Sequence, residues 1–533
     1  MNHPKIALTF SGGGYRAATF HLGALSMLNH VKLTDGSTLL DHVEVLSTVS
    51  GGTITGLRYM LARTQGQPVE EMERELYDFL TSVDLITQAV RRIADKKEDH
   101  HVSIIRTMAD IYDEQLFGGA RMGELMDNVK RIPVNHFSAN ATDFSFALPF
   151  RFQVTDDVSR TGSYGVVGNK ELRIPREVAC HIRLADALAC SSCAPIGFEP
   201  MMFPSDFRLQ ETEAVAQYKE ANKPFGIMDG GIVDNQGIQP VILAEQRMKK
   251  GSKETVGNVT DLVIVSDVAT PYMDDYTPVE NTLPRWLSHL TLKKINRCFR
   301  YTEIVLTAVL ALCIFFAPKW VTSIAAVLWT LTTLLHVGFA FGKKKIYSAL
   351  RKTIVQHSIR ELLSLNIGEI FQLLANRATS TAKMVSSVFL KHIRRLEYDT
   401  LYEDSRWRNR LIMNGLYELR AGEKWEKKQK TGVLPKVLTP TQKMQETSEA
   451  AANMGTTLWF TDEEKAAALP QQVWAAGQYT LCYNLLEYIH KLKTDPTNTN
   501  EHHALIVACE PQLMEAWTKF QENPLWMVEE RLS

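Results

Sequence analysis

Ser50 stands in the first of three short segments whose residue types could carry out acyl transfer. It follows the apolar run His42–Val49 and is followed by Gly51 and Gly52. A serine on a tight turn between a strand and a helix presents its hydroxyl above the carboxyl ends of the strands. The usual pattern of this turn is G-x-S-x-G; here Gly52 is present and position 48 is Thr. We predict Ser50 as a nucleophile, with a serine that caps a helix N-terminus as the alternative.

The second segment is the glycine loop, Ser11–Arg16 (SGGGYR). Its glycines lie between a strand-like run and a helical pattern, so their N–H groups are available to bind an anion. In acyl transfer this anion is the oxyanion of the tetrahedral intermediate. We predict an oxyanion hole built from Gly12, Gly13 and Gly14, with Arg16 facing the oxyanion or a substrate phosphate.

The glycine loop also fits the dinucleotide pattern G-x-G-x-x-G/A, with Ala17 in the last position. That pattern requires an acidic residue at the end of the second strand to bind the ribose. The second predicted strand ends at Val49-Ser50 instead, and Glu44 lies inside it. The sequence therefore favours an oxyanion loop over a nucleotide site.

The third segment is Met228-Asp229-Gly230-Gly231. An aspartate that closes a strand-like run before two glycines can hold its carboxylate at the edge of the sheet. Hydrogen-bonded to a serine hydroxyl, such a carboxylate can act as the general base, and burial raises its pKa. We predict Asp229 as the base for Ser50, with an ordinary turn aspartate as the alternative. A histidine triad using His21 or His42 is a competing mechanism.

Strand-like and helical segments alternate around these three segments, as in a three-layer α/β/α fold with a mostly parallel sheet. We expect this domain to occupy residues 1–280. The expected strands are Lys5–Phe10, His42–Val49, Phe144–Val154, 225–233 and 261–268, and the expected helices in the first part of the chain are Arg16–His30 and Thr53–Thr64.

Two apolar runs, Ile304–Ala317 and Trp320–Phe341, follow this domain and are separated only by Pro318-Lys319. A helix needs roughly 20 apolar residues to cross a bilayer, which the second run provides. Basic residues on both sides of the pair favour a cytoplasmic location for both ends. We predict a membrane-associated hairpin within residues 281–350, with the catalytic domain on the cytoplasmic side; a buried helical pair of a soluble domain is the alternative. The basic residues are Lys293, Lys294, Arg297, Arg300, Lys343, Lys344, Lys345, Arg351 and Lys352.

The remaining residues, 351–533, are expected to form a helical C-terminal region. Residues 421–455 are rich in lysine, threonine and glutamate and are predicted to be a mobile linker. Residues 456–492 form an apolar and aromatic helical stretch that could pack on the first domain.

The composition limits the possible partners. The formal net charge is −1 and the sequence pI is about 7.0, so bulk electrostatics give no reason to expect a nucleic-acid partner. Of the seven cysteines only Cys190 and Cys193 lie close together, and no second pair completes a zinc site. We expect no metal and a membrane lipid as the partner, and the sequence leaves a homo-oligomer open.

Taken together, the three segments resemble the patatin-like phospholipase family. The resemblance rests on Gly12–Arg16, Val49–Gly52 and Asp229–Gly231, supported by Leu188–Pro195 and Asn140–Asp143. It implies a phospholipid acyl hydrolase with Ser50 as nucleophile, Asp229 as base, an oxyanion loop at Gly12–Gly14 assisted by Arg16, and no cofactor or catalytic histidine. Thr48 departs from the family pattern. A catalytically silent scaffold and a ligand-regulated lipase effector are the alternatives.

Overall fold

The computed structural model describes residues 3–95, 103–156, 167–251, 259–270, 273, 275–353, 365–404, 406–407, 409–494 and 501–533. They form two compact units, one made of Met1–Met273 and Val385–Ser533, the other of Asp274–Met384. The second unit is thus an insertion into the first. The C-terminal region predicted from residue 351 onward is not a separate domain, because its larger part completes the first unit.

The first unit is built on a sheet whose central strands are parallel, in the order β10-β9-β1-β2-β3. Antiparallel strands extend it beyond β3. The prediction of an α/β/α fold with a mostly parallel central sheet is confirmed. The strands are β1 Ile6–Phe10, β2 Val43–Val49, β3 His136–Asp143, β4 Leu148–Thr155, β5 Val167–Gly168, β6 Arg173–Ile174, β7 Met201–Phe203, β8 Phe225–Asp229, β9 Leu262–Asp267 and β10 Leu411–Gly415.

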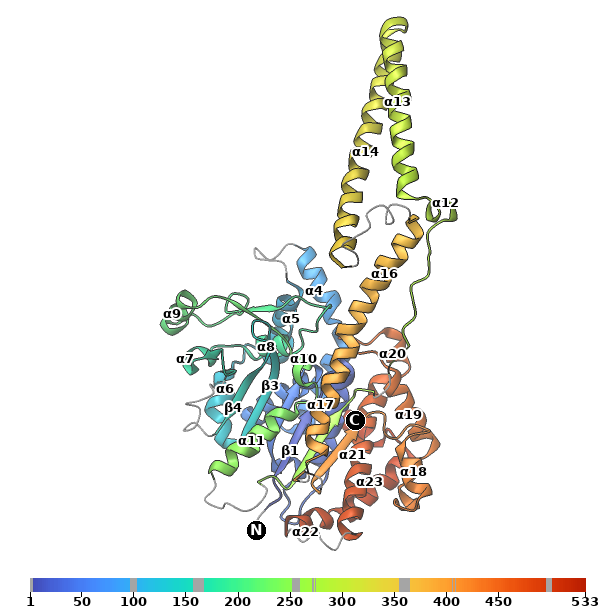
Figure 1. Cartoon of the computed structure of the whole chain (residues 1–533). Coiled ribbons are helices and arrows are strands. Elements are labelled where there is room, and N and C mark those ends of the chain that lie inside the picture. Colours follow the sequence, from blue (N-terminus) through green and yellow to red (C-terminus); the bar gives the residue numbers. More distant parts are fainter. Residues whose placement is uncertain are drawn as a thin grey trace. The chain divides into compact units, whose positions relative to one another are not determined.

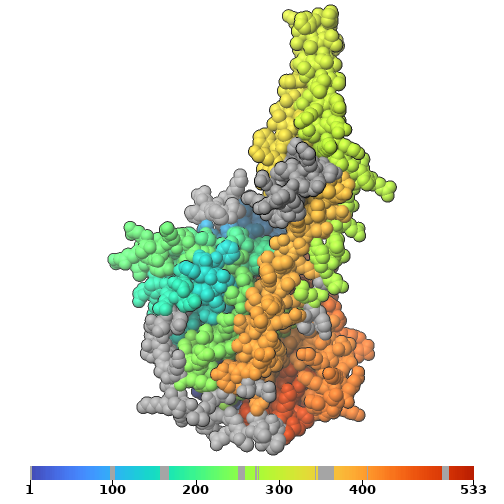
Figure 2. Space-filling view, in the orientation of Figure 1, coloured from blue at the N-terminus to red at the C-terminus, as the bar shows by residue number. Residues whose placement is uncertain are grey.

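Successive residues of β1 pack into different clusters, as the period of two in a strand requires. Ile6, Leu8 and Phe10 belong to the large core on the side of the first helices, whereas Ala7 belongs to a smaller cluster with α11 and α17. Those two helices lie side by side (Figures 1 and 2). The sheet is therefore covered on both faces. The main helices are α1 Gly14–His30, α2 Gly51–Gln65, α3 Val69–Ser82, α4 Leu85–Ala94, α5 Ile104–Tyr112, α6 Met122–Asn128, α8 Leu184–Ser191, α9 Glu213–Ala221, α11 Ile238–Gly251, α17 Leu390–Tyr402, α18 Lys424–Lys430, α19 Gln442–Asn453, α21 Leu469–Thr494, α22 Glu501–Ala508, α23 Glu510–Glu522 and α24 Trp526–Leu532.

Helix α21 packs directly on α1, through glycines in both helices. A Cβ on Gly477 would lie 2.0 Å from the Phe20 carbonyl oxygen, and one on Gly23 would lie 2.2 Å from the Trp474 carbonyl oxygen. The Trp474 indole N–H donates to Ser26 Oγ at 3.0 Å. Small residues let the two backbones touch, and the α21 stretch packs on the first domain as proposed from its sequence.

The predicted linker 421–455 is folded into helices instead. Thr441 caps the N-terminus of α19 by accepting a bond from the Met444 N–H, and Met444 is buried. Trp425 in α18 is also buried and donates to the Arg420 carbonyl. The composition was misleading because a few buried residues suffice to dock two short, charged helices.

The second unit contains two long helices, α13 Leu292–Phe316 and α14 Lys319–Thr353, together with the short α12 Arg285–Ser288 and with α16 Ile367–Lys383. Helices α13 and α14 run side by side (Figure 1). Trp329 bonds to Thr307, and His336 to Glu303, so residue numbers rise in one helix as they fall in the other. The pair is antiparallel. Its predicted basic flanks lie on the first turns of α13 and the last turns of α14, and thus at the same end.

Candidate active site

Ser50 and Asp229 are brought together by two strands that meet head-on along the same edge of β3. Strand β2 runs parallel to β3 and ends with Val49 opposite Asn140. Strand β8 approaches from the other direction and ends with Asp229 opposite Ala141. Ser50 is the next residue after β2. The topology therefore places the predicted nucleophile and base at one point of the sheet although 179 positions (229 − 50) separate them.

Ser50 occupies a strained turn between β2 and α2. Its φ is +52° and its ψ is −121°, in a region that non-glycine residues rarely adopt. The two glycines after it let the turn pack closely against the backbone of β1 and the glycine loop. A Cβ on Gly51 would lie 2.1 Å from the Gly14 carbonyl oxygen, and a Cβ on Gly52 would lie 2.6 Å from the Phe10 carbonyl oxygen. Ser50 is partly exposed to solvent. This is the geometry of a nucleophile turn.

Thr48 takes the position of the first glycine of the usual pattern without disturbing the turn. A Cβ on Gly56 would lie 2.3 Å from the Thr48 methyl group, so the methyl group fits only because residue 56 has no side chain. The Thr48 hydroxyl accepts a bond from Thr53 Oγ1 at 3.1 Å and donates to the Ser138 carbonyl at 3.4 Å. The departure at position 48 is matched by a glycine two turns into α2.

The Asp229 carboxylate is buried, and burial raises its pKa to about 6. The Gly231 N–H, which donates to Oδ1 at 2.6 Å, and the Ser50 hydroxyl lower the pKa by favouring the charged form. The carboxylate is thus ionised at neutral pH, yet basic enough to accept a proton from a nearby hydroxyl.

The hydroxyl of Ser191, which ends α8, fixes the relative position of these strands. It accepts the Ser50 N–H at 2.9 Å and donates to the Asn140 carbonyl at 2.7 Å. Two residues after Ser191, the Cys193 carbonyl accepts the Asp229 N–H at 3.0 Å. The end of α8 therefore touches both members of the pair. In the sequence analysis Ser191 appears only within the supporting stretch Leu188–Pro195, with no role of its own.

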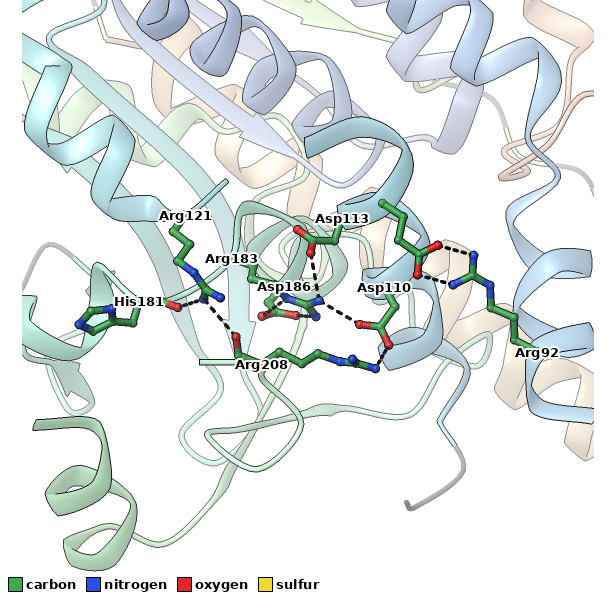
Figure 3. A network of polar contacts seen from close by, with 9 residues as sticks. Arg92, Asp110, Asp113, Arg121, His181, Arg183, Asp186 and Arg208 are labelled. Carbon is green, nitrogen blue, oxygen red and sulfur yellow. Dashed lines mark hydrogen bonds and ion pairs between the residues drawn. The ribbon is translucent and has the colours of Figure 1, made fainter. Parts of the chain in front are cut away.

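The beginning of α8 is anchored by a buried charge network (Figure 3). Arg183 bonds to Asp186 through Nε and Nη2, and to Asp110 through Nη1 at 2.9 Å. Arg208 Nη2 pairs with the other carboxylate oxygen of Asp110, Oδ2. Breaking one partner of such a buried pair typically costs about 3–5 kcal/mol. The network holds α8 in place, and through Ser191 it holds the site.

In the glycine loop, two N–H groups are already used: Gly12 donates to the Asn235 carbonyl at 3.1 Å and Tyr15 to the Thr457 carbonyl at 2.8 Å. Among the described residues, no hydrogen-bond partner is found for the N–H of Gly13 or Gly14. The loop reaches Ser50, since a Cβ on Gly12 would lie 3.0 Å from that of Ser50. Gly13 and Gly14 are thus the free donors beside the nucleophile turn.

Residues 8–242 match the family model described as patatin-like phospholipase. This segment is a patatin-like phospholipase domain. The resemblance noted in the sequence and the expected fold class are thereby confirmed, and the match ends a few residues beyond the D-G-G segment.

Solved structures of human GIVD cytosolic phospholipase A2 show a distant similarity. The complex with methyl gamma-linolenyl fluorophosphonate and terbium chloride is 16% identical, with 50% of this chain and 40% of that chain covered and a TM-score of 0.29. A second structure is 14% identical, with 50% and 45% covered and a TM-score of 0.29. The chain thus spans less than half of their length, and such scores support no further argument. The comparison with curated proteins gave no match.

Arg16 of the patatin-like domain does not face the site. Its guanidinium is buried and donates to the carbonyls of Met454 at 2.6 Å, Ala452 at 3.2 Å and Val268 at 3.4 Å. Burial is the largest cause that lowers its pKa. The prediction that Arg16 points toward an oxyanion or a phosphate is wrong for this structure, because backbone carbonyls engage the guanidinium.

His21 and His42 have other partners than Ser50 and Asp229. His21 is fully buried, stacks on Phe10, and lies within hydrogen-bond distance of Ser266 Oγ and the Ser11 carbonyl. Burial lowers its pKa to about 4. His42 bonds to Ser37 near the surface. Both histidines have structural partners away from Ser50.

Asn235 is a site residue that the sequence analysis did not assign. Its side-chain oxygen lies 2.5 Å from a Cβ placed on Gly12 and 2.6 Å from one placed on Gly231. The amide therefore sits between the glycine loop and the turn that follows Asp229. The only signal in the sequence was its position just after the D-G-G segment. Within the described parts of the chain, no group of three or more His, Cys, Asp or Glu is arranged to hold a metal.

Proposed function

We propose that this protein hydrolyses acyl esters of phospholipids or related lipids through Ser50 and Asp229. The observation that carries the proposal is the convergence of β2 and β8 on β3, which puts a strained serine beside a buried carboxylate whose pKa is about 6. The patatin-like domain supports the lipid substrate class.

The reaction proceeds in two balanced steps. Ser50 Oγ attacks the ester carbonyl carbon while its proton passes to Asp229, and the N–H groups of Gly13 and Gly14 stabilise the oxyanion. Collapse of the intermediate breaks the ester C–O bond, and the leaving alcohol takes the proton from Asp229. Water then attacks the acyl-Ser50 ester with Asp229 again accepting a proton. The fatty acid leaves, and the proton returns to Ser50.

Two exposed apolar side chains on segments that contact β8 suit a lipid substrate. Ile196 lies three residues after Cys193, whose carbonyl bonds to Asp229, and its side chain is 64% exposed at a φ of +73°. Phe144, 62% exposed, follows β3 three residues past Ala141, so about 10 Å beyond the level of Asp229. Exposed apolar side chains at this place can contact an acyl chain or a lipid surface.

We further propose that α13 and α14 attach the protein to a membrane. Both helices are long and apolar enough to cross one, with a mean hydropathy of 1.8, and very little of either is buried. The connecting tip carries Phe315, Phe316 and Trp320, which are 67–85% exposed. The basic end would lie at the cytoplasmic headgroups with the catalytic unit on that side. The uncharged part of α13, Ile304–Phe316, extends about 20 Å, less than a bilayer core of about 30 Å, so a full crossing would also require the helix turns before Ile304.

The decisive experiment is labelling by a fluorophosphonate probe, followed by mass spectrometry of the labelled peptide. We expect label on Ser50 in the wild type and none in Ser50→Ala, with ester hydrolysis lost in both Ser50→Ala and Asp229→Asn. Ser192→Ala is the matched control, because this buried serine bonds to carbonyls of α8 and to Tyr112 rather than to Ser50 or Asp229. Unlabelled wild type would favour a scaffold or a lipase that requires an activating ligand, and full activity in Ser50→Ala would disprove the assignment.

A further inference from the structure

Residues from outside the patatin-like segment hold the glycine loop on one side. The Thr457 carbonyl accepts the Tyr15 N–H at 2.8 Å. The same carbonyl oxygen lies 2.3 Å from a Cβ placed on Gly14, so this glycine is pressed against the segment Ala452–Thr457. This segment connects α19 to the residues before α21, more than 200 positions beyond the end of the family match at residue 242.

Arg16 ties the same segment to the beginning of α1. Its Nη1 donates to the carbonyls of Met454 and Ala452, and it lies 3.4 Å from the Tyr417 hydroxyl. The Tyr417 hydroxyl also donates to the Ala452 carbonyl at 3.1 Å. A planar guanidinium with several donors is suited to binding several carbonyls at once, which a lysine ammonium cannot do in the same geometry. The segment and the loop are therefore joined at both ends of Gly14–Arg16.

A second contact reaches the opposite end of the loop from strand β10. Asn414 Nδ2 donates to Ser266 Oγ at 3.0 Å, and Ser266 Oγ lies 2.9 Å from His21 Nδ1. His21 Nε2 lies 3.0 Å from the Ser11 carbonyl. A carbonyl can only accept, so neutral His21 carries its proton on Nε2, and Ser266 donates to Nδ1. All four residues are buried.

We propose that the C-terminal part of the first unit is a working part of the catalytic site: it fixes the glycine loop beside Ser50, with Arg16 as the positioning residue. The inference rests on the function proposed above. Since Gly13 and Gly14 are the donors available to an oxyanion, a shift of the loop removes stabilisation that exists only in the transition state. We call the contacts of Ala452–Thr457 and Tyr417 with Tyr15 and Arg16 the clamp. Loss of the clamp therefore lowers kcat and leaves KM nearly unchanged.

The competing explanation is that Arg16 contacts the oxyanion or a substrate phosphate directly. The two explanations differ at Tyr417, whose hydroxyl bonds to Arg16 and to the Ala452 carbonyl and, within the described residues, to no backbone group of the glycine loop. A direct role for Arg16 makes Tyr417→Phe silent. A clamp makes it a weaker version of Arg16→Met.

The test compares Arg16→Met, Arg16→Lys, Tyr417→Phe and a control, Lys428→Met. Lys428 pairs with Glu487 in the same C-terminal part and does not contact the loop. On a soluble short-chain ester we expect kcat to fall about 100-fold in Arg16→Met, less in Arg16→Lys and several-fold in Tyr417→Phe, with KM within twofold and the control unchanged. Hydrogen exchange of the peptide containing Tyr15 should accelerate in the same order.

The outcomes separate this proposal from the function. Wild-type kcat in Arg16→Met, or loss in Arg16→Met with an unchanged Tyr417→Phe and unchanged exchange at Tyr15, would overturn the clamp. A wild type that fluorophosphonate does not label, but whose exchange at Tyr15 responds to Arg16→Met, would count against a constitutively active hydrolase and leave the clamp standing as a structural contact. If Arg16→Met does not fold, Tyr417→Phe decides alone.

Discussion

Helix α21 and the pair α13–α14 are both long and contain many apolar residues, yet they meet opposite surroundings. Most of α21 is buried in the first unit, including its polar residues Gln478 and Asn484. The windows of α13 and α14 that could cross a membrane are 0% and 6% buried. The more apolar helices are thus the exposed ones. Hydropathy alone does not decide burial in a protein core: α21 is buried through small residues and specific hydrogen bonds, whereas the more apolar pair has the length and composition of helices that can cross a membrane.

The largest effect should come from a pair of glycine substitutions, one in each region. Gly477→Val places a side chain against the Phe20 carbonyl, whereas the same change at Gly338 in α14 meets open space. We expect Gly477→Val to lose about 3 kcal/mol of unfolding free energy or to fail to fold, and Gly338→Val to change it by less than about 0.5 kcal/mol. Urea unfolding of the detergent-solubilised protein measures both. Equal losses would mean that α14 is packed like α21.

The next prediction tests whether the exposed pair α13–α14 lies in a membrane rather than in water. Leu335 in α14 is 65% exposed. A lysine at this depth should weaken membrane partitioning by about 2.5–3.5 kcal/mol, while Leu335→Ala has a smaller effect. Carbonate extraction of membranes measures the retained fraction, and urea unfolding should show that the first unit keeps its stability. Unchanged retention of Leu335→Lys would contradict a membrane location of this face.

A smaller difference is expected for two tryptophans that each donate one hydrogen bond. Trp474 is buried and bonds to Ser26, whereas Trp329 bonds to Thr307 on an exposed helix pair. Trp474→Phe should cost about 2 kcal/mol, because the change leaves a void and removes a buried hydrogen bond, although the Ser26 hydroxyl keeps its bond to the Leu22 carbonyl. Trp329→Phe should cost less than about 1 kcal/mol. Thermal unfolding compares the two, and a larger cost for Trp329 would reverse the assignment of core and surface.

The smallest effect concerns pH. Burial raises the pKa of Asp229 to about 6, and only the carboxylate can accept the Ser50 proton. kcat/KM should therefore rise about tenfold per pH unit below 6 and level off above it. Substitutions in the exposed pair, such as Gly338→Val, should leave this midpoint unchanged on a soluble ester. A midpoint near 4 in the wild type would argue against a buried base.

The sequence was informative where chemistry depends on local pattern. The turns at Ser50 and Asp229 and the edges of β1, β2 and β9 lie within a residue or two of their predicted places. The run Phe144–Val154 was only partly correct, since residues 144–147 form the turn between β3 and β4. In sequence this turn resembles a strand, because Phe144 and Phe146 alternate with small residues. In the structure both phenylalanines face solvent.

Long-range partners were not predictable from local pattern. Arg16 looked like a charge for the oxyanion because its partners, carbonyls beyond residue 450, have no side-chain signature. Strand β10 was missed because its sequence, Leu411–Gly415, is short and becomes a strand only by pairing with β9. The role of Ser191 depends likewise on contacts across the sheet.

The insertion of the second unit has a consequence for the order of events during synthesis. The ribosome releases α13 and α14 before it has made β10, α19 or α21. At about 5–20 residues per second, residues 343–494 take on the order of ten seconds or more to follow. For most of that interval the apolar pair is outside the ribosome while β9 still has an unpaired edge and the glycine loop lacks its contacts with Ala452–Thr457. Under the membrane attachment proposed above, a growing chain would therefore meet the bilayer before the proposed catalytic site is complete.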